Sequence, residues 1–115
     1  MKGEPRYQLA IPIPVRLERA DGSASTEYAV NLSAGGMCLH LREPMDPDEK
    51  LVLRFRVPGI DVLVATRACV VWSQEVKVDA LGGLHIETGL RFEGLDPNTR
   101  RQIFEFASRP SEAGR

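Results

Sequence analysis

The chain has 115 residues and a formal net charge of -1, and 43% of its residues are hydrophobic and 27% charged. This length suits one domain with its own core and excludes a pair of domains. The composition is ordinary for a globular protein, which excludes a disordered or fibrous chain. Because acidic residues slightly outnumber basic ones, a nucleic-acid polymer is not expected as a partner.

The chain is also expected to be cytoplasmic and not to insert into a membrane. Its longest apolar runs, such as Val62 to Ala65, are far shorter than the roughly 18 residues of a membrane span. The stretch from Met1 to Val15 is interrupted by prolines and lacks the continuous apolar centre of a secretory signal. Cys38 and Cys69 are therefore expected to be reduced and buried within strands.

Alternating apolar residues and regular turn signals predict six strands. Their expected ranges are residues 11–17, 26–33, 37–41, 51–57, 62–72 and 84–92. In the second strand, the two-residue period places Tyr28, Val30 and Leu32 on the apolar face. Trp72, at the end of the fifth strand, is expected to belong to the core, and the less favoured alternative is a stacking platform. Residues 74–83 mix charges with two glycines and are expected to form a loop or a ragged hairpin end.

A helix is expected after the strands, because Asp96 can cap a first turn and Pro97 is tolerated there. Ile103, Phe106 and Ala107 fall on one face of this helix. Six short strands predict a small antiparallel barrel with the helix at one end, since closing the sheet removes exposed edges. The expected limits are a flexible N-terminal arm at 1–10, the barrel and helix at 11–107, and a tail at 108–115.

The most distinctive stretch is Asn31 to Gly36, which reads Asn-Leu-Ser-Ala-Gly-Gly. The two-residue period turns Asn31 and Ser33 the same way, off the apolar face. Adjacent glycines tolerate positive φ and let a ligand approach the backbone closely. The stretch thus indicates a small polar concavity with exposed N–H groups. The alternative is a hairpin or bulge whose side chains only satisfy local backbone groups.

This Asn-x-Ser-x-x-Gly pattern resembles the second signature motif of PilZ domains, bacterial receptors for cyclic di-GMP. Arg6 stands where the family's Arg-x-x-x-Arg motif begins, residues 70–72 resemble the end of its long strand, and residues 89–92 resemble its last strand. The resemblance implies a mainly β fold, a six-stranded antiparallel PilZ-type barrel with a C-terminal α-helix. It also implies that cyclic di-GMP binds at Arg6, Asn31, Ser33, Gly35 and Gly36.

The chain departs from the family at the second motif arginine, because Ala10 stands four positions after Arg6. A charge-assisted hydrogen bond contributes roughly 1.5–3 kcal/mol, so this loss could weaken binding by about ten- to a hundredfold. Arg16, on the outward face of the first strand, is a candidate substitute.

Two functions remain open at this point. The first is a cyclic di-GMP receptor or adaptor, in which binding orders the arm and creates or masks a surface for an unidentified protein partner. The second is a degenerate PilZ domain that binds no nucleotide and docks a motility, secretion or signalling protein.

Catalysis is not expected, because the sequence offers no nucleophile–base set, no phosphate loop and no paired carboxylates at a defined spacing. A metal is not expected either, since there is no Cys-x-x-Cys and His40 and His85 are far apart in the sequence. No cofactor is expected beyond the nucleotide ligand.

Overall fold

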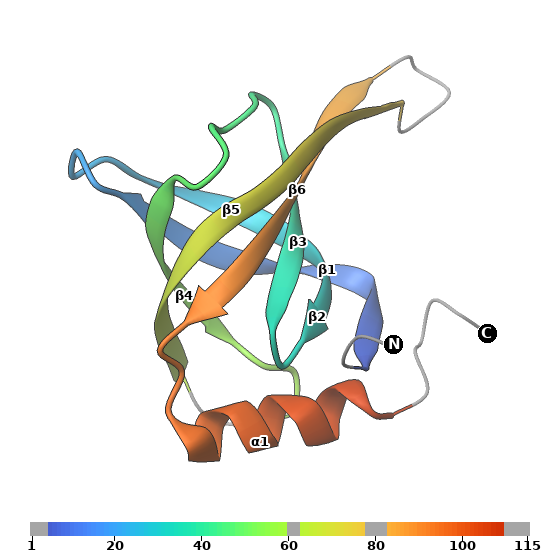
Figure 1. Ribbon diagram of the computed structural model, residues 1–115. Coiled ribbons are helices and arrows are strands. Elements are labelled where there is room, and N and C mark those ends of the chain that lie inside the picture. The colour runs from blue at the N-terminus through green and yellow to red at the C-terminus, as the bar shows by residue number, and fades with distance from the viewer. Residues whose placement is uncertain (1–4, 60–62, 78–82, 110–115) are drawn as a thin grey trace.

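Six strands and one helix make up the computed structural model, which describes residues 5–59, 63–77 and 83–109 (Figure 1). The elements are β1 (Arg6–Arg19), β2 (Ala24–Ser33), β3 (Gly36–Leu41), β4 (Lys50–Arg56), β5 (Leu63–Lys77), β6 (Leu84–Glu93) and α1 (Pro97–Ala107). The strands form a closed barrel in the order β1-β2-β3-β6-β5-β4, and all neighbours are antiparallel. Closure pairs each strand on both sides, so the predicted barrel with a C-terminal helix is confirmed.

Helix α1 closes the end of the barrel where β2 passes into β3 (Figure 1). The side chain of Asp96 accepts a hydrogen bond from the Thr99 N–H at 2.9 Å, and Pro97 opens the first turn, as predicted. Ile103, Phe106 and Ala107 are buried, which confirms the predicted apolar face. The ring of Phe106 packs on that of Tyr7 from β1, with 4.4 Å between ring centroids.

Strand β1 begins at Arg6, ahead of the predicted start at Ile11. Tyr7 and Leu9 point into the core and are 7% and 8% exposed, and Arg6 pairs with Ser33 of β2. Apolar burial against α1 thus fixes a stretch that polar composition marked as an arm. Residues 6–10 of the predicted arm are strand, whereas residues 1–4 of that arm and 110–115 of the predicted tail lie outside the described residues.

The prediction that Tyr28, Val30 and Leu32 share one inward face was wrong. Ala29 and Leu32 are both fully buried, whereas Tyr28 is 51% exposed. The cause is a shift in the pairing of β2 with β3 between Ala29 and Asn31. An extra residue at such a bulge reverses the alternation of inward and outward side chains.

A second bulge explains why the predicted core position of Trp72 was also wrong. The pairing of β5 with β6 shifts between Val70 and Trp72, and the indole is 41% exposed. Beyond it, β5 continues to Lys77 and stays paired with β6. Of the loop or ragged hairpin end predicted from residue 74, residues 74–77 thus form the hairpin end. Figure 1 shows this hairpin projecting from the barrel. Val62 and the predicted loop residues 78–82 lie outside the described residues.

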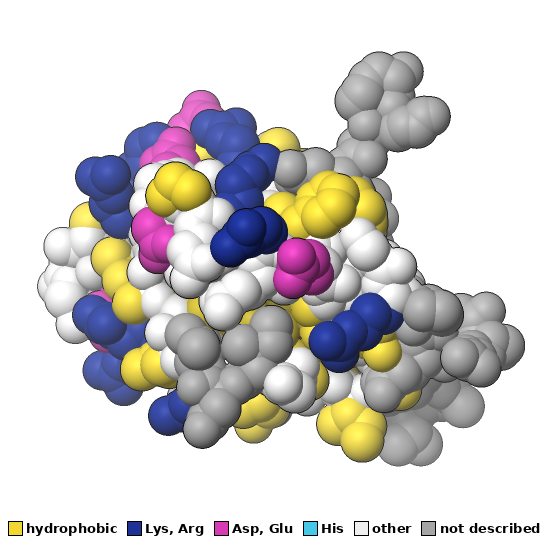
Figure 2. Space-filling model, turned by 90° about the horizontal axis from the view of Figure 1, so that it is seen from below, with side chains coloured by type: hydrophobic (Ala, Val, Ile, Leu, Met, Phe, Trp, Pro, Cys, Tyr) yellow, Lys and Arg dark blue, Asp and Glu magenta, His cyan; other side chains and the backbone are white. Residues whose placement is uncertain are grey.

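The surface carries charges of both signs close together. Figure 2, a view from below with respect to Figure 1, shows basic, acidic and apolar side chains interspersed on one face. On β1 and β4, Glu18 accepts hydrogen bonds from Arg16 at 3.0 Å and Arg54 at 3.1 Å. These two bonds, that from Arg16 first, lower the pKa of Glu18. Within the described ranges, no helix combines the length and apolar character needed to cross a membrane.

Both cysteines are free and buried, as predicted, and we expect them to react slowly in the folded protein. Burial raises the pKa of the Cys38 thiol to about 11, so roughly one molecule in a thousand carries its thiolate at pH 8. Ellman's reagent should react with the folded protein at least about a hundredfold more slowly than with the protein in denaturant. Rapid release of one equivalent of chromophore from the folded protein would contradict this.

Candidate functional site

The connection between β2 and β3 is held together by Ser33. Its hydroxyl donates to the Gly36 carbonyl at 3.3 Å and accepts from the N–H groups of Gly35 and Gly36 at 3.3 and 3.2 Å. These contacts use the one donor and both lone pairs of the hydroxyl, and Ser33 is 3% exposed. Ser33 therefore shapes the loop, as the locally bonded alternative predicts. The N–H groups of the two glycines were predicted to be exposed. This was wrong, because both donate to the Ser33 hydroxyl.

Gly36 lets β3 and β6 approach closely at the end of the connection, where β3 begins. It pairs with Arg91, and a Cβ at this position would overlap the backbone carbonyl oxygen of Leu90. The neighbouring Gly35 carbonyl accepts a hydrogen bond from the Phe92 N–H at 2.8 Å. The glycine at position 36 is thus required by strand pairing, whatever else approaches it.

Arg6 lies beside this connection on the side of β1, opposite the side on which Gly36 pairs with β6. Its Nη1 donates to the Asn31 amide oxygen at 3.0 Å, and both side chains belong to the outward faces of β1 and β2. Arg6 is exposed, and Asn31 is partly buried. The structure therefore brings together the first motif arginine and the motif asparagine, whereas the Ser33 hydroxyl is bonded within its own loop.

A hollow of about 350 Å³ opens between this connection and strands β5 and β6. Four of the five predicted site residues line it. The fifth, Asn31, is not among the lining residues but accepts a hydrogen bond from Arg6, which is. Among the residues that the structure describes, the lining is Arg6, Ser33, Gly35, Gly36, Met37, Val71, Trp72, Gly89, Leu90 and Arg91. These described residues include two arginines and no acidic side chain, so they favour an anion.

Trp72 supplies the aromatic surface of the hollow, a role that the sequence offered only as the less favoured alternative to a core position. The indole is turned outward by the bulge in β5 and stands opposite Gly89 of β6. A Cβ at Gly89 would overlap Nε1 of the indole, so this glycine lets the ring lie against the strand. The sequence shows a tryptophan at the end of one strand and a glycine in another. That the two residues are paired is known only from the register of β5 and β6.

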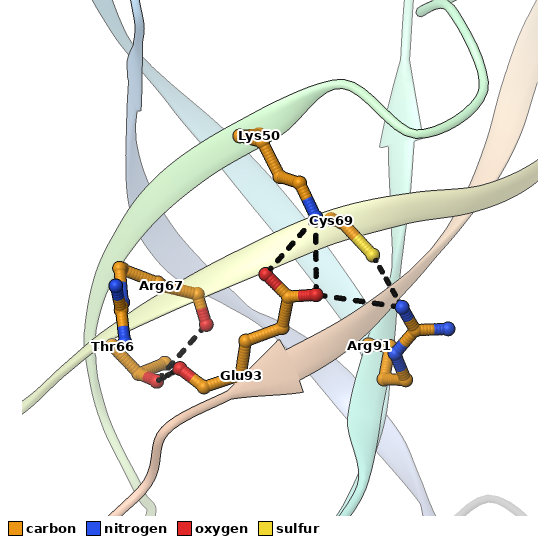
Figure 3. A network of polar contacts seen from close by, with 6 residues as sticks. All are labelled: Lys50, Thr66, Arg67, Cys69, Arg91 and Glu93. Atoms are coloured by element: carbon orange, nitrogen blue, oxygen red, sulfur yellow. Dashed lines mark hydrogen bonds and ion pairs between the residues drawn. The ribbon is translucent and has the colours of Figure 1, made fainter.

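Arg91 joins the hollow to a network of polar contacts on β4, β5 and β6 (Figure 3). Its Nη2 donates to Sγ of Cys69 at 3.0 Å and to a carboxylate oxygen of Glu93 at 3.4 Å. Nζ of Lys50 donates to both oxygens of Glu93, at 3.2 and 3.3 Å. These contacts, that of Lys50 first, lower the pKa of Glu93.

A larger hollow of about 830 Å³ lies near the β1–β2 hairpin and the segment after β3. None of the predicted site residues lines it, and its charged residues have both signs. His40, on its wall, contacts Glu87 at 3.3 Å and lies 5.3 Å from His85 between ring centroids. In the described part of the chain, no group of three or more His, Cys, Asp or Glu side chains is arranged to hold a metal ion. The smaller hollow is thus the better candidate site.

Solved structures with the same fold include several PilZ proteins. The PilZ domain with c-di-GMP of YcgR from Escherichia coli has a TM-score of 0.74 and 20% identity, over 89% of this chain and 85% of that one. The MrkH–c-di-GMP complex of K. pneumonia has a TM-score of 0.75 and 16% identity, over 92% of this chain and 49% of that one. The inhibitor of motility MotI/DgrA from Bacillus subtilis has a TM-score of 0.74 and 16% identity, over 93% and 49%. The chain thus spans about half the length of the last two.

The protein is thus a six-stranded antiparallel barrel domain with a C-terminal helix at one end and a hollow beside the β2–β3 connection. The family model described as PilZ domain matches residues 3–109, and the chain belongs to this family. Comparison with curated proteins gives no match.

Proposed function

We propose that this PilZ domain is a receptor for cyclic di-GMP and that the nucleotide binds in the hollow beside the β2–β3 connection. The observation that carries the proposal is the Arg6–Asn31 hydrogen bond of 3.0 Å at the rim of a hollow whose described lining residues include no acid. The YcgR and MrkH structures described above contain c-di-GMP, which supports the same ligand here.

The groups of the hollow match the chemistry of this nucleotide. Cyclic di-GMP carries two anionic phosphates and two flat guanine bases. Arg6 can bond a phosphate or the O6/N7 edge of guanine, and Asn31 holds its guanidinium in place. The exposed indole of Trp72 offers a guanine a stacking surface. The role of the site is recognition, without a catalytic step.

Binding would change the surface that a protein partner meets. Arg6 is already part of β1, so the nucleotide would redirect this exposed guanidinium and need not build the strand. A partner that contacts the rim could then distinguish the bound from the free domain. We place this signalling function in the cytoplasm.

The test is a calorimetric titration of cyclic di-GMP into the wild type, Arg6→Ala and Arg16→Ala. Arg6→Ala should weaken binding by about ten- to a hundredfold, because it removes a charge-assisted hydrogen bond. Arg16→Ala removes an equal charge from the same strand outside the hollow and should bind like the wild type. Equal heats from the wild type and Arg6→Ala would refute the proposed site, and a silent wild type would refute the function.

One observation favours the second candidate, a domain that has lost the nucleotide and docks a protein constitutively. Ala10 replaces the second arginine of the motif, and the side chain of Ser33 faces its own loop. In that case the wild type would give no heat with cyclic di-GMP, and Ala10→Arg would introduce binding.

A further inference from the structure

The Arg-x-x-x-Arg motif lacks its second arginine, because residue 10 is Ala10. Strand β6 brings another arginine to the hollow. Arg6 pairs with Ser33 at the end of β2, and Arg91 pairs with Gly36 at the start of β3. The two arginines therefore flank the β2–β3 connection from its two sides. Both line the same hollow, whereas Ala10 does not.

The alternative substitute, Arg16, is too far away. It stands ten positions after Arg6 on one strand, which corresponds to about 30 Å at roughly 3.3 Å per residue. Its guanidinium bonds Glu18 at 3.0 Å, close to Arg54 of β4. Arg16 is also absent from the lining of the hollow.

Arg91 can turn toward a ligand without leaving a buried charge behind. Its side chain is 58% exposed, and only Nη2 makes the contacts to Cys69 and Glu93, at 3.0 and 3.4 Å. Figure 3 shows the other terminal nitrogen pointing away from this network. Glu93 keeps both hydrogen bonds from Lys50 when Arg91 moves, so it stays paired.

We propose that Arg91 is the second phosphate-binding arginine of this domain, acting from β6 in place of the motif arginine lost at Ala10. The inference rests on the proposed function, since it concerns the same nucleotide. Arg6 would bind one phosphate and Arg91 the other, with the β2–β3 connection between them. Each arginine then meets one charge of a dianion, in a hollow that is lined by no acid among the described residues.

The experiment is a titration of cyclic di-GMP into wild type, Arg91→Ala, Arg91→Lys and Arg16→Ala. Arg91→Ala should lose about ten- to a hundredfold in affinity. Arg91→Lys keeps a point charge that phosphate accepts and should stay within about threefold of the wild type. Arg16 is the matched control, because its side chain is also 58% exposed and also pairs with a glutamate two positions on. Arg16→Ala should bind as the wild type does.

Each outcome decides between the two proposals. Binding by the wild type with equal binding by Arg91→Ala would overturn the role of Arg91 and leave the receptor function standing. A loss in Arg16→Ala alone would transfer the role to Arg16. A loss in Arg91→Lys as large as in Arg91→Ala would contradict a phosphate contact, because it would show that the planar fork is needed. A silent wild type would remove both proposals. Thermal unfolding within about 3 °C of the wild type checks that each variant is folded.

Discussion

Gly36→Ala is expected to lower the free energy of unfolding by about 3 kcal/mol or more. The new Cβ would overlap the carbonyl oxygen of Leu90, which is backbone of the neighbouring strand β6. Backbone cannot rotate away, so β3 and β6 would have to separate where they pair. The N–H of Gly36 also bonds Ser33, so the separation would disturb the loop. Urea unfolding followed by circular dichroism measures the loss.

Gly89→Ala provides the matched control. Its Cβ would meet the indole of Trp72, a side chain that is 41% exposed and can swing into solvent. We expect a loss below about 1 kcal/mol together with a red shift in fluorescence, since Trp72 is the only tryptophan of the chain. Equal losses from the two variants would show that Gly36 is not constrained by the backbone of β6.

The sequence predicted the fold well because its strands alternate and its helix carries standard start signals. Asp96, Pro97 and the apolar face of α1 are local features, and local features determine a helix end. The errors in which face a side chain occupies fall at two bulges. Tyr28 and Trp72 were assigned to the wrong face because one extra residue in a strand reverses the alternation, and only cross-strand pairing reveals it.

The candidate site was predictable in the part that is contiguous in sequence. Asn31 to Gly36 is recognisable as a motif, and the structure adds that Asn31 contacts Arg6. Trp72 and Arg91 were not predicted as site residues, because they come from β5 and β6 and meet the motif only when the barrel closes. The local bonding of Ser33 was foreseen as one of the two alternatives, because its partners Gly35 and Gly36 belong to the same short stretch.

Ala10→Arg is expected to raise the affinity for cyclic di-GMP by about tenfold. Tyr7 and Leu9 point inward, so residue 10 lies on the outward face of β1 that also carries Arg6. An arginine there adds a cation close to the hollow. Ala20→Arg adds the same charge in the exposed turn after β1 and should leave the calorimetric dissociation constant unchanged. Equal gains in affinity from both variants would show that the gain comes from net charge and not from the position of the arginine.

The size of this gain also depends on Arg91. If Arg91 already holds the second phosphate, an arginine at position 10 should help more in an Arg91→Ala background than in the wild type, because the two side chains would serve one charge. Titrations of the four combinations form a double-mutant cycle that measures the coupling. Strictly additive effects would mean that residues 10 and 91 act on separate parts of the nucleotide, which would contradict the substitution of one arginine by the other.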